Sequence, residues 1–173
     1  MMKRFIFAAV IFLGVVLVPL FCFAASCDSE SYYITFTLDG TAYECNYGAT
    51  DVNEVAFGNV ISGEGQIIFI GGASSYGAST EEPDVGIRIM LNGTTTGTYV
   101  YGSHAMIMIF ADGVGYELVS GSVILTVAGE AGSGTYEGTF SGVVMDEGEN
   151  SLNLSNGSFR VQRLADNTYF PDL

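Results

Sequence analysis

Two acidic runs contain the side chains of this sequence that are best suited to binding a metal ion. Their carboxylates are Asp146, Glu147 and Glu149 in one run, and Glu81, Glu82 and Asp84 in the other. Carboxylate oxygens are the hard ligands that Ca²⁺ prefers, but neither run has the spacing of an EF-hand loop. The sequence therefore predicts no cofactor, with calcium possible at these two loops. The alternative is that these acids are solvated turn residues.

Paired carboxylates are also the groups that hydrolyse glycosidic bonds, because that reaction needs two of them across a cleft. An acid-rich chain offers many such pairs by chance, and this chain has no tryptophan to serve as a sugar platform. No G-x-S-x-G nucleophile elbow is present. We therefore predict a protein that is not an enzyme and has no catalytic residues. A small carboxylate-dependent, glycosidase-like hydrolase on the same scaffold is the alternative.

The single histidine, His104, directly follows Ser103. On a strand these two side chains would point to opposite faces, so they do not form a nucleophile and base pair, and a structural histidine is expected. One histidine and few cysteines also exclude the usual zinc, haem c and iron–sulfur sites.

The N-terminus has the plan of a secretory signal peptide. Lys3 and Arg4 precede an apolar run from Phe5 to Phe23, and small residues follow up to Ser26. We expect residues 1–26 to be a signal peptide and residues 27–173 to be one exported domain. The apolar run is also nearly long enough to span a bilayer, so an uncleaved signal anchor is the alternative.

Cys27 stands at the expected cleavage point and has two alternative roles. Small residues before a cysteine resemble the lipobox of bacterial lipoproteins, although Ala24 replaces the usual leucine. That resemblance implies a lipid on Cys27 and attachment to a membrane. Alternatively, Cys27 pairs with Cys45 in an oxidising compartment, which closes a loop of 18 residues and stabilises the fold by roughly 3 kcal/mol.

Residues 27–173 are strongly acidic. They contain three arginines and no lysine against 19 carboxylates, a formal charge of −16. Such a surface repels nucleic acid and anionic lipid headgroups, so nucleic-acid binding is not expected. The acids either attract cations or keep an exported β-protein soluble.

Alternating apolar residues predict strands along the whole domain. Tyr136, Phe140 and Val144 share one face of a strand within the segment 122–163, around which three or four antiparallel strands are expected. Asp39-Gly40, Asn92-Gly93 and Asp112-Gly113 are turn signals, and residues 71–83 have the composition of a surface loop that could touch a ligand. The sequence predicts an all-β antiparallel sandwich or jelly roll of about nine to eleven short strands, with a β-barrel as the alternative.

The export signal, the cysteine at the cleavage point, the ITFTLDG hairpin at 34–40 and the LNLSNGSFRVQR segment at 152–163 together resemble a broad group of small, uncharacterised β-sandwich lipoproteins of Gram-negative bacteria. The resemblance implies a β-sandwich in the cell envelope and carries no catalytic residues.

We therefore expect an exported envelope or secreted module, a periplasmic or outer-envelope lipoprotein or a secreted protein, with a binding or structural role towards a protein or glycan. A β-sheet assembly subunit is a further alternative and would show an unpaired hydrophobic edge.

Overall fold

The computed structural model describes residues 32–46, 57–63, 65–73 and 85–167. Within these ranges the chain forms ten strands and no helix, so the all-β prediction and its strand count are confirmed. None of the described residues belongs to a helix that could cross a membrane. The expected signal peptide, Cys27 and the acidic run of Glu81, Glu82 and Asp84 lie outside the described residues.

The strands are β1 (Tyr33–Leu38), β2 (Thr41–Asn46), β3 (Phe57–Gly63), β4 (Gly65–Ala73), β5 (Val85–Asn92), β6 (Gly97–Val100), β7 (Ala105–Ala111), β8 (Val114–Ala128), β9 (Thr135–Asp146) and β10 (Ser151–Arg163).

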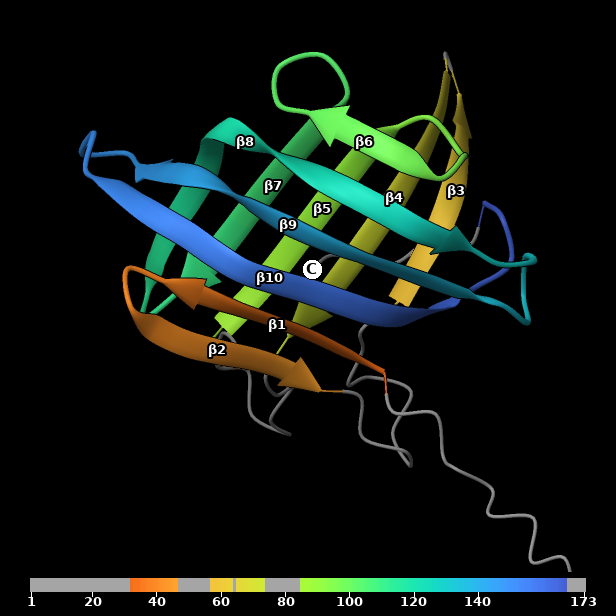
Figure 1. Cartoon of the computed structure of the whole chain (residues 1–173), viewed down its shortest axis with the longest axis horizontal. Coiled ribbons are helices and arrows are strands. Elements are labelled where there is room, and N and C mark those ends of the chain that lie inside the picture. The colour runs from red at the N-terminus through yellow and green to blue at the C-terminus, as the bar shows by residue number, and fades with distance from the viewer. Residues whose placement is uncertain (1–31, 47–56, 64, 74–84, 168–173) are drawn as a thin grey trace, which may run out of the picture.

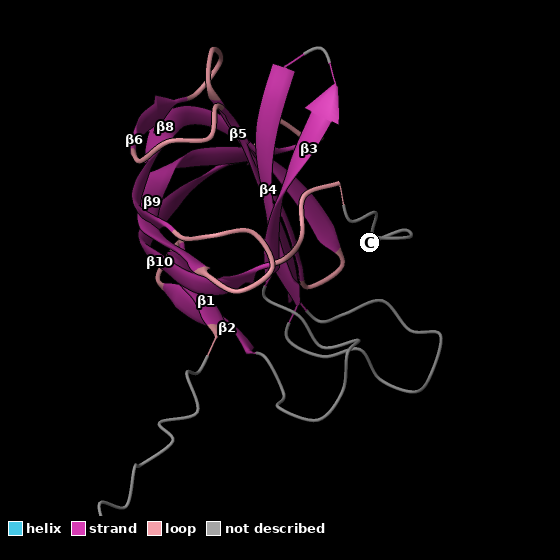
Figure 2. Ribbon diagram, turned by 90° about the vertical axis from the view of Figure 1, so that its right-hand side faces the viewer, coloured by secondary structure: helices cyan, strands magenta, loops and turns pink. Residues whose placement is uncertain are grey.

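All ten strands belong to one continuous sheet (Figure 1). Its order is β2-β1-β10-β3-β4-β5-β7-β8-β6, and β9 pairs with both β10 and β8. Every pairing is antiparallel except a short parallel contact of two residue pairs between β10 and β3. Because β9 links β8 back to β10, the sheet curls over itself into a half-barrel (Figure 2). The two separate sheets of a sandwich are therefore not confirmed, and the curled form lies closer to the barrel alternative.

The bend in β8 allows the sheet to curl. The first residues of β8 pair with β7, whereas residues 122–125 pair with β6. The register with β9 shifts between Leu118 and Ser120, and Gly121 has a φ of 136°. A bulge next to a positive-φ glycine increases local twist and turns a strand. In Figure 1, β6 and β9 run along one diagonal of the molecule, and β5 and β7 run along the other.

The core fills the space inside the curl. On β5 the buried residues are Val85, Ile87, Ile89 and Leu91, which alternate with residues on the outer face. Tyr136, Phe140 and Val144 are buried on β9, as the alternation in the sequence predicts. Phe140 also packs against Phe159 of β10, with ring centroids 6.4 Å apart.

Two predicted turns have the backbone geometry that their residues favour. Asp39 and Gly40 have φ values of 46° and 88° between β1 and β2, and Asp112 and Gly113 have 52° and 78° between β7 and β8. Positive φ at both central residues matches the twist of a two-residue hairpin. These turns therefore confirm the two hairpins predicted from Asp-Gly pairs.

Candidate functional site

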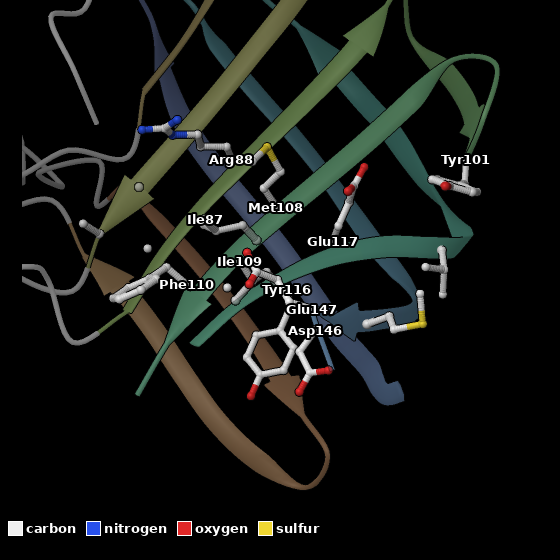
Figure 3. Close-up of a pocket in the computed structure, with 16 residues that line it drawn as sticks. Ile87, Arg88, Tyr101, Met108, Ile109, Phe110, Tyr116, Glu117, Asp146 and Glu147 are labelled. Atoms are coloured by element: carbon white, nitrogen blue, oxygen red, sulfur yellow. The ribbon is translucent and has the colours of Figure 1, made fainter. Parts of the chain in front are cut away.

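A hollow of about 690 Å³ lies over β5, β7 and the start of β8, and the end of β9 also contributes to it (Figure 3). We call it the outer hollow, because Arg88, Met108, Phe110 and Glu117 line it from the outward-facing positions of their strands. Tyr101 forms the rim on the side away from Arg88 in Figure 3.

Strand register explains why the surface is hollowed here. Phe110 of β7 lies directly between Gly86 of β5 and Gly115 of β8. Neither glycine has a side chain to cover the sheet beside the aromatic ring, and a Cβ added to Gly115 would meet no atom within 4 Å. The space on the Gly115 side of Phe110 is therefore open.

The next row along the sheet gives the outer hollow its charges. Met108 lies directly between Arg88 and Glu117 in the strand register. A cation and a carboxylate thus stand on either side of a thioether, about one strand spacing away from it on each side. The row combines an apolar centre with two polar margins of opposite charge.

Arg88 differs from the other two arginines of the domain. Arg160 forms an ion pair of 3.4 Å with Glu137, and Arg163 forms one of 3.1 Å with Asp166. Arg88 forms no ion pair with another residue of the described ranges. Its guanidinium points away from Met108 across the neighbouring strand in Figure 3, where it can meet an anionic group of a ligand.

Asp146 closes the β9–β10 turn at the lower margin of the outer hollow. Its Oδ1 accepts a hydrogen bond from the Asn150 backbone N–H, and its Oδ2 accepts one from the Asn150 side-chain amide, each at 2.8 Å. These donors from Asn150 hold the pKa of the Asp146 carboxyl below its usual range. The carboxylate is therefore ionised at neutral pH, and its hydrogen bonds with Asn150 stabilise the turn.

The calcium prediction gains no support from this turn. Among the described residues there is no group of three or more histidine, cysteine, aspartate or glutamate side chains placed to hold a metal ion. Glu147 and Glu149 are exposed in the turn, and the oxygens of Asp146 already accept hydrogen bonds from Asn150. Since Glu81, Glu82 and Asp84 lie outside the described residues, calcium binding stays a prediction.

Cys45 lies fully buried on β2, opposite Ile34 of β1, and forms no disulfide with another described residue. Burial, with a smaller contribution from the charge of Glu44, raises its pKa to about 12. The thiol is therefore protonated and unreactive at physiological pH. Cys27 lies outside the described residues, so the choice between a lipid and a disulfide stays open.

Ser103 and His104 correct one expectation. They lie in the turn before β7 and not on a strand, so their side chains meet: the Ser103 Oγ and the His104 Nδ1 are 2.7 Å apart. Both residues are exposed, and among the described residues the histidine forms no hydrogen bond to a carboxylate that could orient it. The pair therefore lacks the third member of a triad.

Comparison with known proteins identifies no relative. No protein-family model matches the chain, and neither a curated protein nor a solved structure matches it.

The outer hollow combines an apolar floor with polar margins. An aromatic ring, a thioether and the open position at Gly115 form an apolar floor, and Arg88 and Glu117 form polar margins. The sequence does not show this site, because only the pairing of β5 with β7 brings the outward faces of 85–92 and 105–111 together. Gly86 and Gly115 are visible in the sequence, but only the strand register shows that they lie on either side of Phe110.

Proposed function

We propose that this protein is an exported, non-enzymatic module of the cell envelope or extracellular space, and that it binds a small amphipathic molecule in the outer hollow. The observation that carries the proposal is the outer hollow itself, with its apolar floor beside Phe110 and its charged margins at Arg88 and Glu117.

The size and chemistry of the outer hollow fit this class of ligand. Small-molecule sites are typically concavities of about 300–1,000 Å³ that are mainly apolar and contain a few polar groups to fix orientation. At about 690 Å³ the outer hollow lies within that range. A ligand with a flat apolar body would cover Gly115 and contact Phe110, and an anionic end would meet Arg88.

Export is supported by the basic start, the apolar run and the small residues before Cys27. The intact mass of the protein from its native host, measured with and without reductant, tests this part of the proposal. A chain that begins at Cys27 supports export, and an added diacylglyceryl group or a loss of two protons that reductant restores distinguishes the lipid from the Cys27–Cys45 disulfide. A mass that includes residues 1–26 contradicts cleavage.

The rival hydrolase needs one carboxyl group that is protonated at neutral pH so that it can act as the general acid. Asp146 has the opposite property, because Asn150 holds its pKa low. Turnover of chromogenic glycosides by the purified protein would favour the rival, provided that it is lost in Glu117→Gln or Glu147→Gln.

The assembly alternative needs a long, apolar, unpaired edge. The two end strands of the sheet are β2, with six residues, and β6, with four. Glu44 on β2 adds a charge to that edge. Both end strands are short and β2 also has a charge, which disfavours strand addition, so we rank assembly below ligand binding.

A fluorescent amphipathic anion, 1-anilinonaphthalene-8-sulfonate, tests ligand binding directly. We expect saturable binding to the folded wild-type protein and at least a tenfold weaker affinity for Gly115→Phe, since the new ring occupies the space that the Cβ position opens onto. Thr139→Phe is the matched control, because Thr139 is exposed on β9 away from the outer hollow. Equal affinities for Gly115→Phe and the wild type would refute the proposal.

A further inference from the structure

Four methionines follow the N-terminal segment in this sequence, and their distribution over the sheet is uneven. They are Met90 on β5, Met106 and Met108 on β7, and Met145 on β9. The inward positions of β5 and β7 hold only isoleucine, valine, leucine and alanine. The methionines of these two strands occupy outward positions, so they do not serve as flexible filling for the core.

Three of these methionines form one compact group. Met90 lies directly opposite Met106 in the register of β5 and β7, and Met108 follows Met106 by two residues on the same face. Directly opposed side chains have Cβ atoms about 4.5–5.5 Å apart, and diagonal neighbours are within reach of long side chains. Met90, Met106 and Met108 can therefore bring three thioether sulfurs to one point; we call them the thioether triad.

The thioether triad is accessible from solvent. Met106 is 37% exposed and Met108 is 42% exposed, and Met90 is half-buried. An ion could therefore reach the sulfurs without any movement of the sheet. Met106 and Met108 are two of nine large apolar side chains exposed among the described residues, and they are the two that contain a soft sulfur donor.

Charge around the thioether triad also suits a cation. Glu117 lies opposite Met108 on β8, and residues 27–173 have a formal charge of −16. Arg88 lies opposite Met108 on the other side, but its guanidinium points away from Met108 (Figure 3). The net negative charge of the domain attracts cations to its surface.

We propose that the thioether triad of Met90, Met106 and Met108 binds a soft monovalent metal ion, Cu(I) or its stand-in Ag(I). Thioethers are soft, neutral ligands that select Cu(I) over the hard cations that prefer oxygen. Three sulfurs from two adjacent strands form one coordination set. This site does not depend on the outer hollow, although Met108 lines both.

Titration of the folded full chain with Ag(I) tests the site. Every variant is made in a Cys22→Ser, Cys27→Ser, Cys45→Ala background, so that none of the three thiols of the chain competes for silver. We expect one saturable Ag(I) site that Met106→Leu weakens at least tenfold and that Met90→Leu and Met108→Leu also weaken. Leucine nearly conserves the volume of methionine, so these exposed substitutions keep the fold.

Met145→Leu is the matched control, because Met145 lies on β9 opposite Glu117 and is not part of the thioether triad. It should leave Ag(I) affinity within twofold of the background. Equal losses in Met145→Leu and Met106→Leu would overturn the site, as would affinity that disappears in His104→Asn and persists in Met106→Leu. The absence of any saturable Ag(I) binding, with the methionine face instead taking up only an apolar partner, would overturn it as well.

Discussion

The phenol of Tyr43 on β2 donates a hydrogen bond of 2.8 Å to the Asp112 carboxylate in the β7–β8 turn. These residues are 69 positions apart in the chain. The bond ties the β1–β2 hairpin to the margin of the sheet whose outer face forms the outer hollow. Asp112 also has a positive φ of 52°, so the turn that sets its backbone also places its carboxylate.

Tyr43→Phe should lower the free energy of unfolding by about 0.5–1.5 kcal/mol, which is typical for one hydrogen bond near a surface. Urea unfolding of the variant and the wild type at pH 7 measures the difference. Asp112→Asn is the companion variant, since it retains an acceptor but removes the charge. A Tyr43→Phe variant as stable as the wild type would show that water replaces the bond without loss.

The same pair predicts a dependence on alkaline pH. The hydrogen bond to Asp112 raises the pKa of the Tyr43 phenol in the folded protein. A pKa raised on folding stabilises the protein below the unfolded value of about 10, and this contribution is lost as the pH rises through the folded pKa. The stability difference between wild type and Tyr43→Phe should therefore shrink above pH 10, whereas a constant difference from pH 7 to 11 would contradict the assignment.

Replacing Tyr136 by phenylalanine should change the stability in the opposite direction to Tyr43→Phe. Its ring is fully buried under the Arg163 guanidinium, which lies 5.3 Å from the ring centroid, but its hydroxyl has no hydrogen-bond partner among the described residues. A buried unpaired hydroxyl costs about 1–3 kcal/mol. Tyr136→Phe should therefore be neutral or more stable by about 1 kcal/mol in urea unfolding.

Tyr99 provides the control for Tyr136, because its hydroxyl donates a hydrogen bond to the Thr95 carbonyl. Tyr99→Phe should lose stability by about 0.5–1.5 kcal/mol. If Tyr136→Phe loses as much as Tyr99→Phe, then the Tyr136 hydroxyl has a partner, such as a buried water, that stabilises the fold.

Much of the fold could be predicted from local residue patterns. Alternation placed Tyr136, Phe140 and Val144 on the buried face of β9, and Asp39-Gly40 marked the β1–β2 hairpin, because these features depend only on neighbouring residues. The curl of the sheet depends instead on the bend in β8. The sequence shows Gly121 but does not show that a carbonyl of β9 lies against it.

The candidate site depends on the register between strands that are distant in the sequence, so it could not be predicted from the sequence. Nothing in the sequence shows that Gly86 and Gly115 flank Phe110, since residues 86 and 115 meet only through β7. The acidic turn around Asp146 is evident in the sequence, but the sequence does not show that both Asp146 carboxylate oxygens accept hydrogen bonds from Asn150. Carboxylates can be recognised as metal ligands from the sequence alone, whereas the methionines share one face only because β5 pairs with β7.

Substitution by alanine should have opposite effects on stability at Gly142, on the inner side of the sheet, and at Gly115, on the outer side. A Cβ on Gly142 would lie 2.1 Å from the Ser120 carbonyl oxygen, so Gly142→Ala must displace backbone at the β8–β9 contact. We expect a loss of about 1–3 kcal/mol or more. Gly115→Ala meets no atom within 4 Å and should stabilise by about 0.4–1 kcal/mol by restricting the unfolded chain. Thermal and urea unfolding of both variants test this contrast.

Cys45 should be inert to thiol reagents in the folded protein. Burial raises its pKa to about 12, so almost no thiolate is present at pH 8. In a Cys27→Ser variant with the N-terminal segment removed by processing, a chromogenic disulfide reagent should find no thiol before denaturation and one equivalent after it. Rapid reaction of the native protein would contradict the buried position of Cys45 on β2.

The most direct test of the outer hollow as a ligand site is a methyl NMR titration of the full chain labelled at the methionine methyl groups. The resonances of Met108 and Met145, which line the outer hollow, should shift together and saturate as the amphipathic anion is added, and those of Met90 and Met106 should shift less. Ag(I) should instead move Met90, Met106 and Met108 and leave Met145 in place. If the amphipathic anion moves no methionine resonance, or moves all four equally, the outer hollow is not the ligand site.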